Sequence, residues 1–295
     1  MSRSLDKEEK TALLGLPLIG LVGFAFALAG SNGNLVAADG ALHPFALSVA
    51  VAFALQWIAF VPAYRYQTEK YFDLVGSLSY ITVALLTYLS AAAPGPRAQL
   101  LLAMILVWAA RLGWFLFSRI HKSGKDGRFD AMKPSILRFG VAWTLQGLWI
   151  TFTAAAGLAA IASPRAQTLD TFAFAGGILW ACGFAIEAIA DKQKRTFKSD
   201  PENAGRFIRS GLWSRSRHPN YFGEIVLWCG VALAAYPSLE GWERFTLLSP
   251  FFVALLLCKI SGIPLLEERA DQKWGGQTDY ESYKKRTPVL IPKIW

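Results

Sequence analysis

The chain has few cysteines, histidines and charged residues, and each scarcity narrows the possible functions. Among its 295 residues only 3 are cysteine and 3 are histidine. Cys182, Cys229 and Cys258 lie in apolar stretches without a C-x-x-C pair, so we expect neither a disulfide framework nor a zinc site. The histidines show no H-x-x-x-H spacing, and we therefore predict no metal site.

The two common nucleotide-binding motifs are also missing. The sequence contains no G-x-G-x-x-G after a strand and no G-x-x-x-x-G-K-[ST]. A nucleotide, if one binds, must therefore be held by helix ends and loops.

Charged residues are scarce and apolar residues are abundant: 17% of residues are charged, 54% are hydrophobic, and the mean hydropathy is +0.33. About 20 apolar residues cross the hydrocarbon core of a bilayer. We predict an all-α, polytopic integral membrane helical bundle with seven or eight transmembrane helices, formed by residues 1–295 as a single transmembrane domain. The first apolar segment has no A-x-A-like cleavage site, so we interpret it as a retained span. The predicted spans are 12–29, 45–64, 73–93, 98–118, 139–162, 171–190, 220–236 and 245–266.

Lysine and arginine alternate between rich and poor loops. The amino terminus, 65–72, 119–138, 191–219 and the tail after Arg269 are rich, whereas the loops between them hold only Arg97, Arg165 and Arg244. The positive-inside rule then places both termini in the cytoplasm and the rich loops against membrane lipid. The net charge of +9 does not predict a nucleic-acid partner, because these loops lack an RNA- or DNA-binding motif.

Charged residues recur every four positions where the sixth span ends. Glu187, Asp191 and Arg195 share one helix face, and Lys198 continues it. A solvated helix end with weak ion pairs would explain most of this pattern. Glu187, however, lies inside the apolar run, which favours a binding site.

The run RSRHPNYFGEIVLW brings ionisable residues to the start of the seventh span. Such groups cost roughly 2.5–3.5 kcal/mol each at bilayer depth, so they usually mark a site. Pro219 fits the first turn of a helix, whose free amides next to Arg217 and His218 could receive a phosphate. Asn220 and Glu224 are four residues apart and suit a carboxamide or an amino group. The alternative is a capped helix start with snorkelling charges.

Three further places hold candidate residues. Arg111 lies within the fourth span and needs a partner, for which Asp73 is a candidate. Arg128 lies in a flexible basic loop, GKDGR, that could cover a nucleotide. Glu267 and Arg269 end the last span, where an interfacial helix of balanced charge is an equally good interpretation.

Together these residues resemble a known group. The runs EAIADKQKRTFKSDP, GLWSRSRHPNYFGE, LLEER and DYESYKKRTPVLIP, within residues 71–295, resemble bacterial membrane proteins related to the steroid 5-alpha-reductase carboxy-terminal domain. More distantly, they look like sterol reductases and isoprenylcysteine carboxyl methyltransferases. The resemblance implies a bacterial inner-membrane protein that takes NADPH from the cytoplasmic side. It also implies that 119–295 is the cofactor-binding part and 12–118 the substrate side.

The resemblance assigns roles to individual residues. Asp191, Arg195 and Lys198 match the helix face that meets the adenosine and phosphate part, and Asn220 and Glu224 match the pair that faces the nicotinamide. The predicted catalytic residues are Glu224, Asn220 and Tyr80. The predicted cofactor-binding residues are Arg111, Arg128, Glu187, Asp191, Arg195, Lys198, Arg217, His218, Asn220, Tyr221, Glu224, Glu267 and Arg269.

The substrate half departs from the steroid reductases. Trp108 stands where they have a tyrosine, and Gln56 is followed by Trp57 in place of their Gln–Glu pair. We therefore expect NADPH-dependent reduction of a conjugated C=C bond in a lipophilic, steroid- or isoprenoid-like substrate, with Tyr80 or Tyr66 as the polar donor. The alternatives are an S-adenosylmethionine-dependent methyltransferase and a non-catalytic lipid-binding protein. Arg195 and Lys198 favour a cofactor with phosphates over S-adenosylmethionine.

Overall fold

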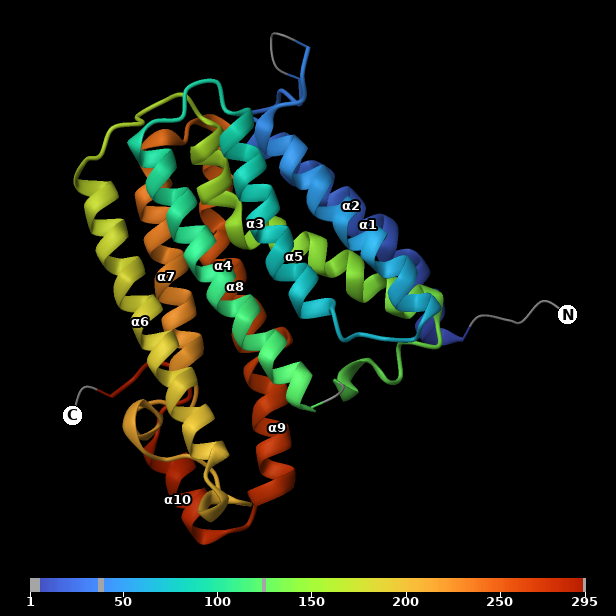
Figure 1. Ribbon diagram of the computed structural model, residues 1–295, viewed down its shortest axis with the longest axis vertical. Helices are drawn as coiled ribbons and strands as arrows, with labels where there is room; N and C mark the ends of the chain where they lie inside the picture. The colour runs from blue at the N-terminus through green and yellow to red at the C-terminus, as the bar shows by residue number, and fades with distance from the viewer. Residues whose placement is uncertain (1–5, 37–39, 124–125, 294–295) are drawn as a thin grey trace, which may run out of the picture. The chain divides into compact units, whose positions relative to one another are not determined.

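The computed structural model of the chain is built from helices (Figure 1). It describes residues 6–36, 40–123 and 126–293, without the side chains of 119–123 and 128. Within these residues β pairing is limited to one bridge, between Val36 and Leu42. This confirms the predicted all-α class. The α-helices are α1 (Lys7–Gly30), α2 (Pro44–Arg65), α3 (Phe72–Ser90), α4 (Pro96–Ser123), α5 (Ile136–Ala162), α6 (Thr171–Ser199), α7 (Pro219–Ala235), α8 (Ser249–Leu255), α9 (Ile263–Trp274) and α10 (Thr278–Arg286).

Within the described residues, seven helical stretches are long and apolar enough to cross a membrane. This confirms a polytopic membrane bundle of the predicted size. The seventh predicted span, 220–236, forms α7, whose 17 residues are about 26 Å long at 1.5 Å per residue, slightly less than the hydrocarbon thickness. The seven stretches are Lys7–Gly30, Pro44–Arg65, Phe72–Ser90, Pro96–Ser118, Ile136–Ala162, Thr171–Ser199 and Gly241–Trp274.

The last stretch is not one regular helix, in contrast to the continuous span predicted over 245–266. It runs through the 3₁₀ turn η5 (Gly241–Leu248), α8 and the π turn η6 (Leu256–Ile260), and breaks before α9. Pro264 occupies the first turn of α9, where its missing N–H is tolerated. π turns often accompany functional sites.

The chain forms two compact units. Unit 1 contains residues 1–173 and 234–249, and unit 2 contains 174–233 and 250–295. The division of a single domain into a substrate part and a cofactor part at 118/119 stays a prediction.

In unit 1, α5 is the central helix. It contacts α1, α2, α3, α4 and η5, and its second half, 154–162, is buried. That half is rich in alanine, and small side chains let neighbouring helices pack closely in a membrane. Phe152 of α5 stacks on Phe26 of α1, with ring centroids 3.9 Å apart.

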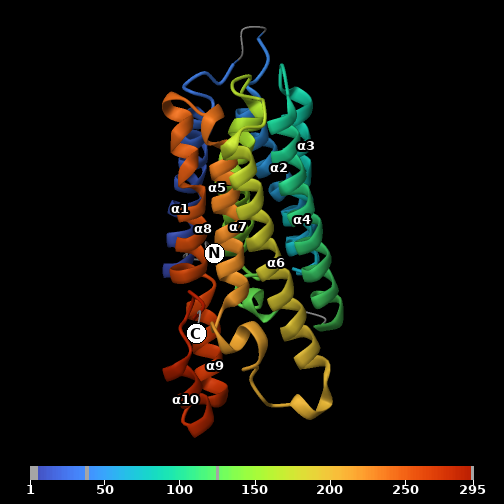
Figure 2. The same ribbon diagram turned by 90° about the vertical axis from the view of Figure 1, so that its left-hand side faces the viewer.

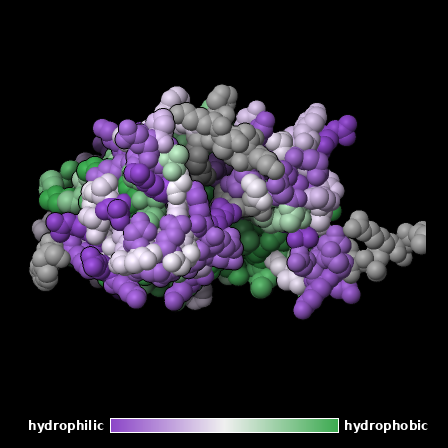
Figure 3. Space-filling model, turned by 90° about the horizontal axis from the view of Figure 1, so that it is seen from below, coloured by the Kyte–Doolittle hydropathy of each residue, from purple (hydrophilic) through white to green (hydrophobic). Residues whose placement is uncertain are grey.

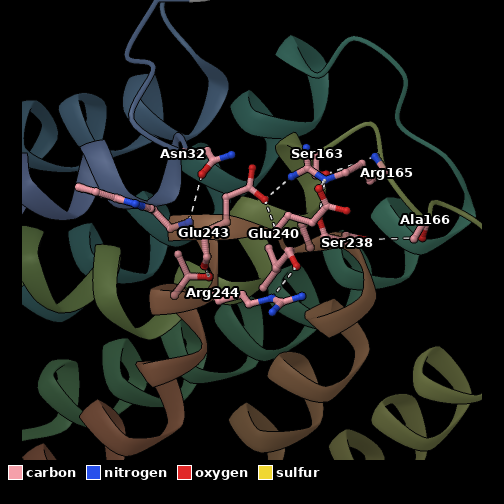
Figure 4. Close-up of polar contacts among 12 residues, drawn as sticks. Asn32, Ser163, Arg165, Ala166, Ser238, Glu240, Glu243 and Arg244 are labelled. Atoms are coloured by element: carbon pink, nitrogen blue, oxygen red, sulfur yellow. Dashed lines mark hydrogen bonds and ion pairs between the residues drawn. The ribbon is translucent and has the colours of Figure 1, made fainter.

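A polar cluster joins loop ends within unit 1 (Figure 4). Glu243, only 4% exposed, forms an ion pair with Arg165 and accepts a hydrogen bond from the Glu240 N–H at 3.0 Å. Ser163 Oγ donates to the Ser238 carbonyl at 2.9 Å. We call these five residues, with Asn32, whose side chain accepts from the Trp242 N–H, the Arg165–Glu243 cluster.

Arg97 also connects loop ends within unit 1. Its side chain is completely buried and donates to the carbonyls of Ala234 at 2.6 Å and Thr168 at 3.1 Å. It also pairs with Asp170 at 2.8 Å. A hydrogen bond from the Ala173 N–H outweighs desolvation and, with Arg97, holds the pKa of Asp170 below its usual range. Arg97 and Arg165, which belong to the loops poor in lysine and arginine, therefore hold the ends of neighbouring loops together.

In unit 2, α6 and α7 pack with their backbones close together, side by side in Figures 1 and 2. A Cβ atom added to Gly183 would lie 2.6 Å from the Gly223 carbonyl oxygen, and one added to Gly230 would lie 2.7 Å from that of Gly176. Glycine is required at these crossings because any side chain would separate the helices.

Candidate functional site

The polar end of unit 2 contains the end of α6, the segment before α7, α9, α10 and the tail. Figure 3 views the end of the molecule that carries α9 and α10, and hydrophilic residues cover most of what is seen there. Most of the predicted cofactor-binding residues belong to this part of the sequence.

Three predicted residues meet here although they are far apart in sequence. Glu267 of α9 binds Arg217 Nη1 through Oε2 at 2.5 Å and His218 Nε2 through Oε1 at 2.8 Å. The side chain of His218 is 5% exposed, that of Arg217 12% and that of Glu267 22%. A carboxylate at Nε2 keeps the proton on that nitrogen in the neutral ring, so Nδ1 is then the acceptor.

The environment of His218 favours the neutral form of the ring. Burial lowers the pKa of His218 and outweighs the opposing effect of the Glu267 contact. The charges of Arg217 and Glu267 cancel, which makes the three residues neutral as a group. This group alone is therefore poorly suited to binding a phosphate, the role that the sequence suggested for Arg217 and His218.

Two buried atoms of this group keep hydrogen-bonding capacity. His218 Nδ1 and Arg217 Nε have no hydrogen-bond partner among the residues that the structure describes. Buried polar atoms are usually satisfied, and exceptions often accompany a bound molecule or water. The ring of Tyr221 lies parallel to that of His218 within 9°, with centroids 5.7 Å apart.

The charged face predicted on α6 divides into two parts. Glu187 and Asp191 are buried, at 3% and 8% exposure, whereas Arg195 and Lys198 are exposed. A Cβ atom on Gly223 would lie 2.6 Å from the Glu187 amide nitrogen. Glu187 is therefore level with the beginning of α7.

Asn220 and Glu224, the predicted nicotinamide pair, are both half-buried in the first turns of α7. Gly223 packs against the backbone of Glu187. Asn220 and Glu224 therefore lie at about the same height along the paired helices α6 and α7 as the buried Glu187 and Asp191.

Lys194 is a cation that our sequence reasoning missed. Its Nζ lies 4.2 Å from the centroid of the Trp213 ring, and its charge helps to lower the pKa of His218. Trp213 is itself buried and donates from Nε1 to the Ala190 carbonyl of α6 at 3.0 Å. Lys194 follows Glu187 by seven residues, which places both on one helix face, but the four-residue series pointed to Arg195.

The other predicted residues are placed as follows. Arg269 is exposed on α9. In unit 1, Arg111 is half-buried on α4, and Tyr80 is 5% exposed on α3, with its ring perpendicular to that of Trp108 at 5.0 Å. The side chain of Arg128 lies outside the described residues. The roles of these residues stay predictions.

Among the described residues, no group of three or more His, Cys, Asp or Glu side chains could hold a metal ion. The polar end of unit 2 thus combines cations, buried carboxylates and open hydrogen-bonding atoms on an integral membrane protein.

Comparison with known proteins defines the family. Residues 59–287 match the family described as "Protein of unknown function (DUF1295)", and the chain belongs to this steroid 5-alpha-reductase-like family. This confirms the resemblance inferred from the sequence.

Several curated proteins are similar to the chain. It is 28% identical over 225 residues to 3-oxo-5-alpha-steroid 4-dehydrogenase 1 of Bos taurus, covering 74% of this chain and 78% of the relative. It is 28% identical to a probable 7-dehydrocholesterol reductase of Acanthamoeba polyphaga mimivirus, covering 40% of this chain and 28% of the relative. It is 30% identical to the probable O-methyltransferase ustE of Ustilaginoidea virens, covering 34% and 40%. No solved structure gives a significant match.

Proposed function

We propose that this protein is an NADPH-dependent membrane reductase of a carbon–carbon double bond conjugated to a carbonyl group in a lipophilic substrate. The observation that carries the proposal is the similarity to 3-oxo-5-alpha-steroid 4-dehydrogenase 1 over 74% of the chain. That name describes oxidoreduction beside a ketone of a steroid. The similarity to a probable 7-dehydrocholesterol reductase supports a reductase of a sterol-like substrate.

The polar end of unit 2 supports a phosphorylated dinucleotide as the cofactor. Lys194, Arg195 and Lys198 carry positive charge on the last turns of α6, and phosphates favour such cations. The buried carboxylates of Glu187 and Asp191 suit donors such as ribose hydroxyls. When bound, NADPH supplies the hydride.

Asn220 and Glu224 would orient the carboxamide of the nicotinamide, because an amide and a carboxylate side chain together accept and donate the hydrogen bonds it needs. Correct positioning of reacting groups can lower a barrier by several kcal/mol. Tyr80 would donate a hydrogen bond to the substrate carbonyl and steady the negative charge that develops on its oxygen. Hydride addition at the β carbon and protonation at the α carbon then complete the reduction.

Thermal stabilisation of the detergent-purified protein tests the cofactor. We expect NADPH, but not S-adenosylmethionine, to raise the melting temperature, since ligands stabilise the folded state that binds them. Glu224→Ala should abolish the NADPH effect, whereas Glu268→Ala, a change to an exposed residue of α9, should preserve it. Unchanged NADPH affinity in Glu224→Ala would refute the nicotinamide role of Glu224.

A methyltransferase is the second candidate, and the similarity to the probable O-methyltransferase ustE favours it. S-adenosylmethionine has no phosphate, so it would not need the cations of α6. Titration of the same preparation with both cofactors separates the two activities. A third candidate, a lipid-binding protein without catalysis, is excluded by NADPH consumption in the presence of any enone lipid.

We also propose that the protein resides in a bacterial inner membrane with both termini cytoplasmic. The basic loops support this orientation. Labelling of a cysteine introduced at the exposed position Lys198 should occur from the cytoplasmic side, and labelling from the opposite side would reverse the topology.

A further inference from the structure

The end of the chain runs along the segment that precedes α7. Beyond α10, the Arg217 N–H donates to the Pro288 carbonyl at 2.9 Å, and the Lys293 N–H donates to the Arg215 carbonyl at 3.0 Å. Arg215 Nη1 donates to the Lys293 carbonyl at 3.1 Å. We call residues 287–293 the C-terminal strap, because they bind the backbone of 215–217 in both directions.

Ser216 connects this strap to His218. Its side chain is completely buried, and its Oγ donates to the Leu290 carbonyl at 2.7 Å. The same oxygen accepts from the His218 N–H at 3.1 Å. Ser216 is therefore a single side chain that fixes the position of the histidine backbone relative to the strap.

Tyr283 of α10 makes a second connection of the same kind. Its hydroxyl donates to the Trp213 carbonyl at 2.7 Å. Desolvation by burial raises the pKa of Tyr283, so the hydroxyl keeps its proton and remains a donor at neutral pH.

The segment needs these external partners because it has little regular structure. Between α6 and α7 the structure contains only the short 3₁₀ turns Pro201–Asn203 and Gly211–Ser214 among its helical elements. Buried backbone N–H and C=O groups outside helices must find partners elsewhere. The C-terminal strap supplies them immediately before Arg217 and His218, whose side chains then reach Glu267.

We propose that the C-terminal strap and Ser216 are positioning elements of the cofactor site. They hold the backbone of Arg217 and His218 so that these side chains meet Glu267, and they do not contact the cofactor themselves. This inference rests on the proposed function. It assigns a positioning role to residues 287–293, none of which was among the predicted site residues.

Ser216→Ala tests the proposal by removing the bonds of the hydroxyl to the carbonyls of Val289 and Leu290 and the bond that it accepts from the His218 N–H. We expect NADPH affinity to fall about tenfold, as for the loss of one well-made buried hydrogen bond. Hydrogen exchange at the amides of Arg217 and His218 should become faster. Ser214→Ala is the matched control, because Ser214 lies in the same segment, is exposed and donates a local hydrogen bond to the Gly211 carbonyl. Ser216→Thr, which keeps the hydroxyl, should restore both properties toward wild type.

The outcomes separate the strap from the proposed function. If hydrogen exchange at the amides of Arg217 and His218 is unchanged in Ser216→Ala, then Ser216 does not fix this backbone, and the proposed role of the C-terminal strap is wrong whichever cofactor binds. Faster exchange with unchanged NADPH affinity overturns the positioning role and leaves the reductase proposal intact. Wild-type protein that binds no NADPH refutes the reductase proposal, and the positioning role with it. If Ser216→Ala does not fold, Tyr283→Phe gives the same two readouts, and no change in either of them overturns the proposal.

Discussion

Two partly buried arginine–glutamate pairs, one in each unit, have different surroundings. The Arg165–Glu243 pair lies among backbone groups, and its neighbouring side chains bind loop carbonyls and amides (Figure 4). The Arg217–Glu267 pair shares its carboxylate with His218, whose ring stacks with that of Tyr221. The first arrangement completes the ends of helices. Arg165 Nε also lacks a hydrogen bond, but it lies 3.6 Å from the carboxylate oxygen Oε2 of Glu240. In the second arrangement the ring nitrogen His218 Nδ1 is a buried acceptor without a hydrogen-bond partner among the described residues, as a binding site requires.

Because their surroundings differ, we expect substitutions in the two pairs to have different effects. Substitution of a residue of the Arg165–Glu243 pair in unit 1 should lower the stability of the folded protein without a specific effect on ligand binding. Substitution of a residue of the Arg217–Glu267 pair in unit 2 should reduce the affinity for the cofactor more than it reduces the stability of the folded protein. The expected effects below decrease from the first to the last.

Arg97→Ala should produce the largest effect. It removes a completely buried cation and leaves Asp170 and two carbonyls without their partner. Each buried carbonyl that loses its donor costs about 1–3 kcal/mol, whereas Asp170 is 41% exposed and can be hydrated. We expect a sharply lower melting temperature and folded yield in detergent, with unchanged NADPH affinity in the protein that folds. Arg244→Ala is the control, because this exposed side chain makes one long hydrogen bond, to the Leu239 carbonyl.

Glu267→Gln and Glu243→Gln test the comparison directly. Glu267→Gln keeps the shape of the side chain but removes the charge that balances Arg217. We expect a loss of about 2 kcal/mol in NADPH binding, which is roughly 30-fold in Kd. Glu243→Gln should instead lower the melting temperature and leave Kd unchanged. Equal effects of both variants on Kd would remove the distinction between the two pairs.

The pH dependence of stability should reveal His218 through a smaller effect. Burial lowers the pKa of His218 below its ordinary 6.5. As pH falls through that ordinary value, the unfolded chain gains a proton that the folded chain does not take, so stability is present above about pH 6.5 and declines below it. His218→Gln should reduce the difference in melting temperature between about pH 7.5 and pH 5.5.

His43 provides the control for this measurement, because burial also lowers its pKa. His43→Gln should remove its own share of the pH dependence and leave that of His218. A profile unchanged by His218→Gln would show that the ring is not held neutral.

The helices of this fold were predictable because their apolar lengths match the bilayer. The fifth span was predicted over 139–162 and occupies Ile136–Ala162. The sixth, predicted over 171–190, continues to Ser199, since its polar end is rich in lysine, glutamine and arginine, which favour helix. The π turn and break inside the last span have no comparable signal in the apolar pattern.

The site was predictable in part. Residue types at bilayer depth pointed to Arg217, His218 and Glu267, but only the fold brings Glu267 to the other two. Arg97 and Arg165 were interpreted through loop charge alone, and a charge count does not distinguish a buried arginine from an exposed one. The carbonyls that accept hydrogen bonds from Ser216 lie more than 70 residues away, so no local pattern indicates its role.

Titration of the wild-type protein with NADPH, NADH and S-adenosylmethionine tests the central claim most directly. We expect NADPH to bind most tightly, because it carries the most phosphate charge for the cations of α6, and S-adenosylmethionine not to bind. Binding of S-adenosylmethionine without binding of NADPH would contradict this claim.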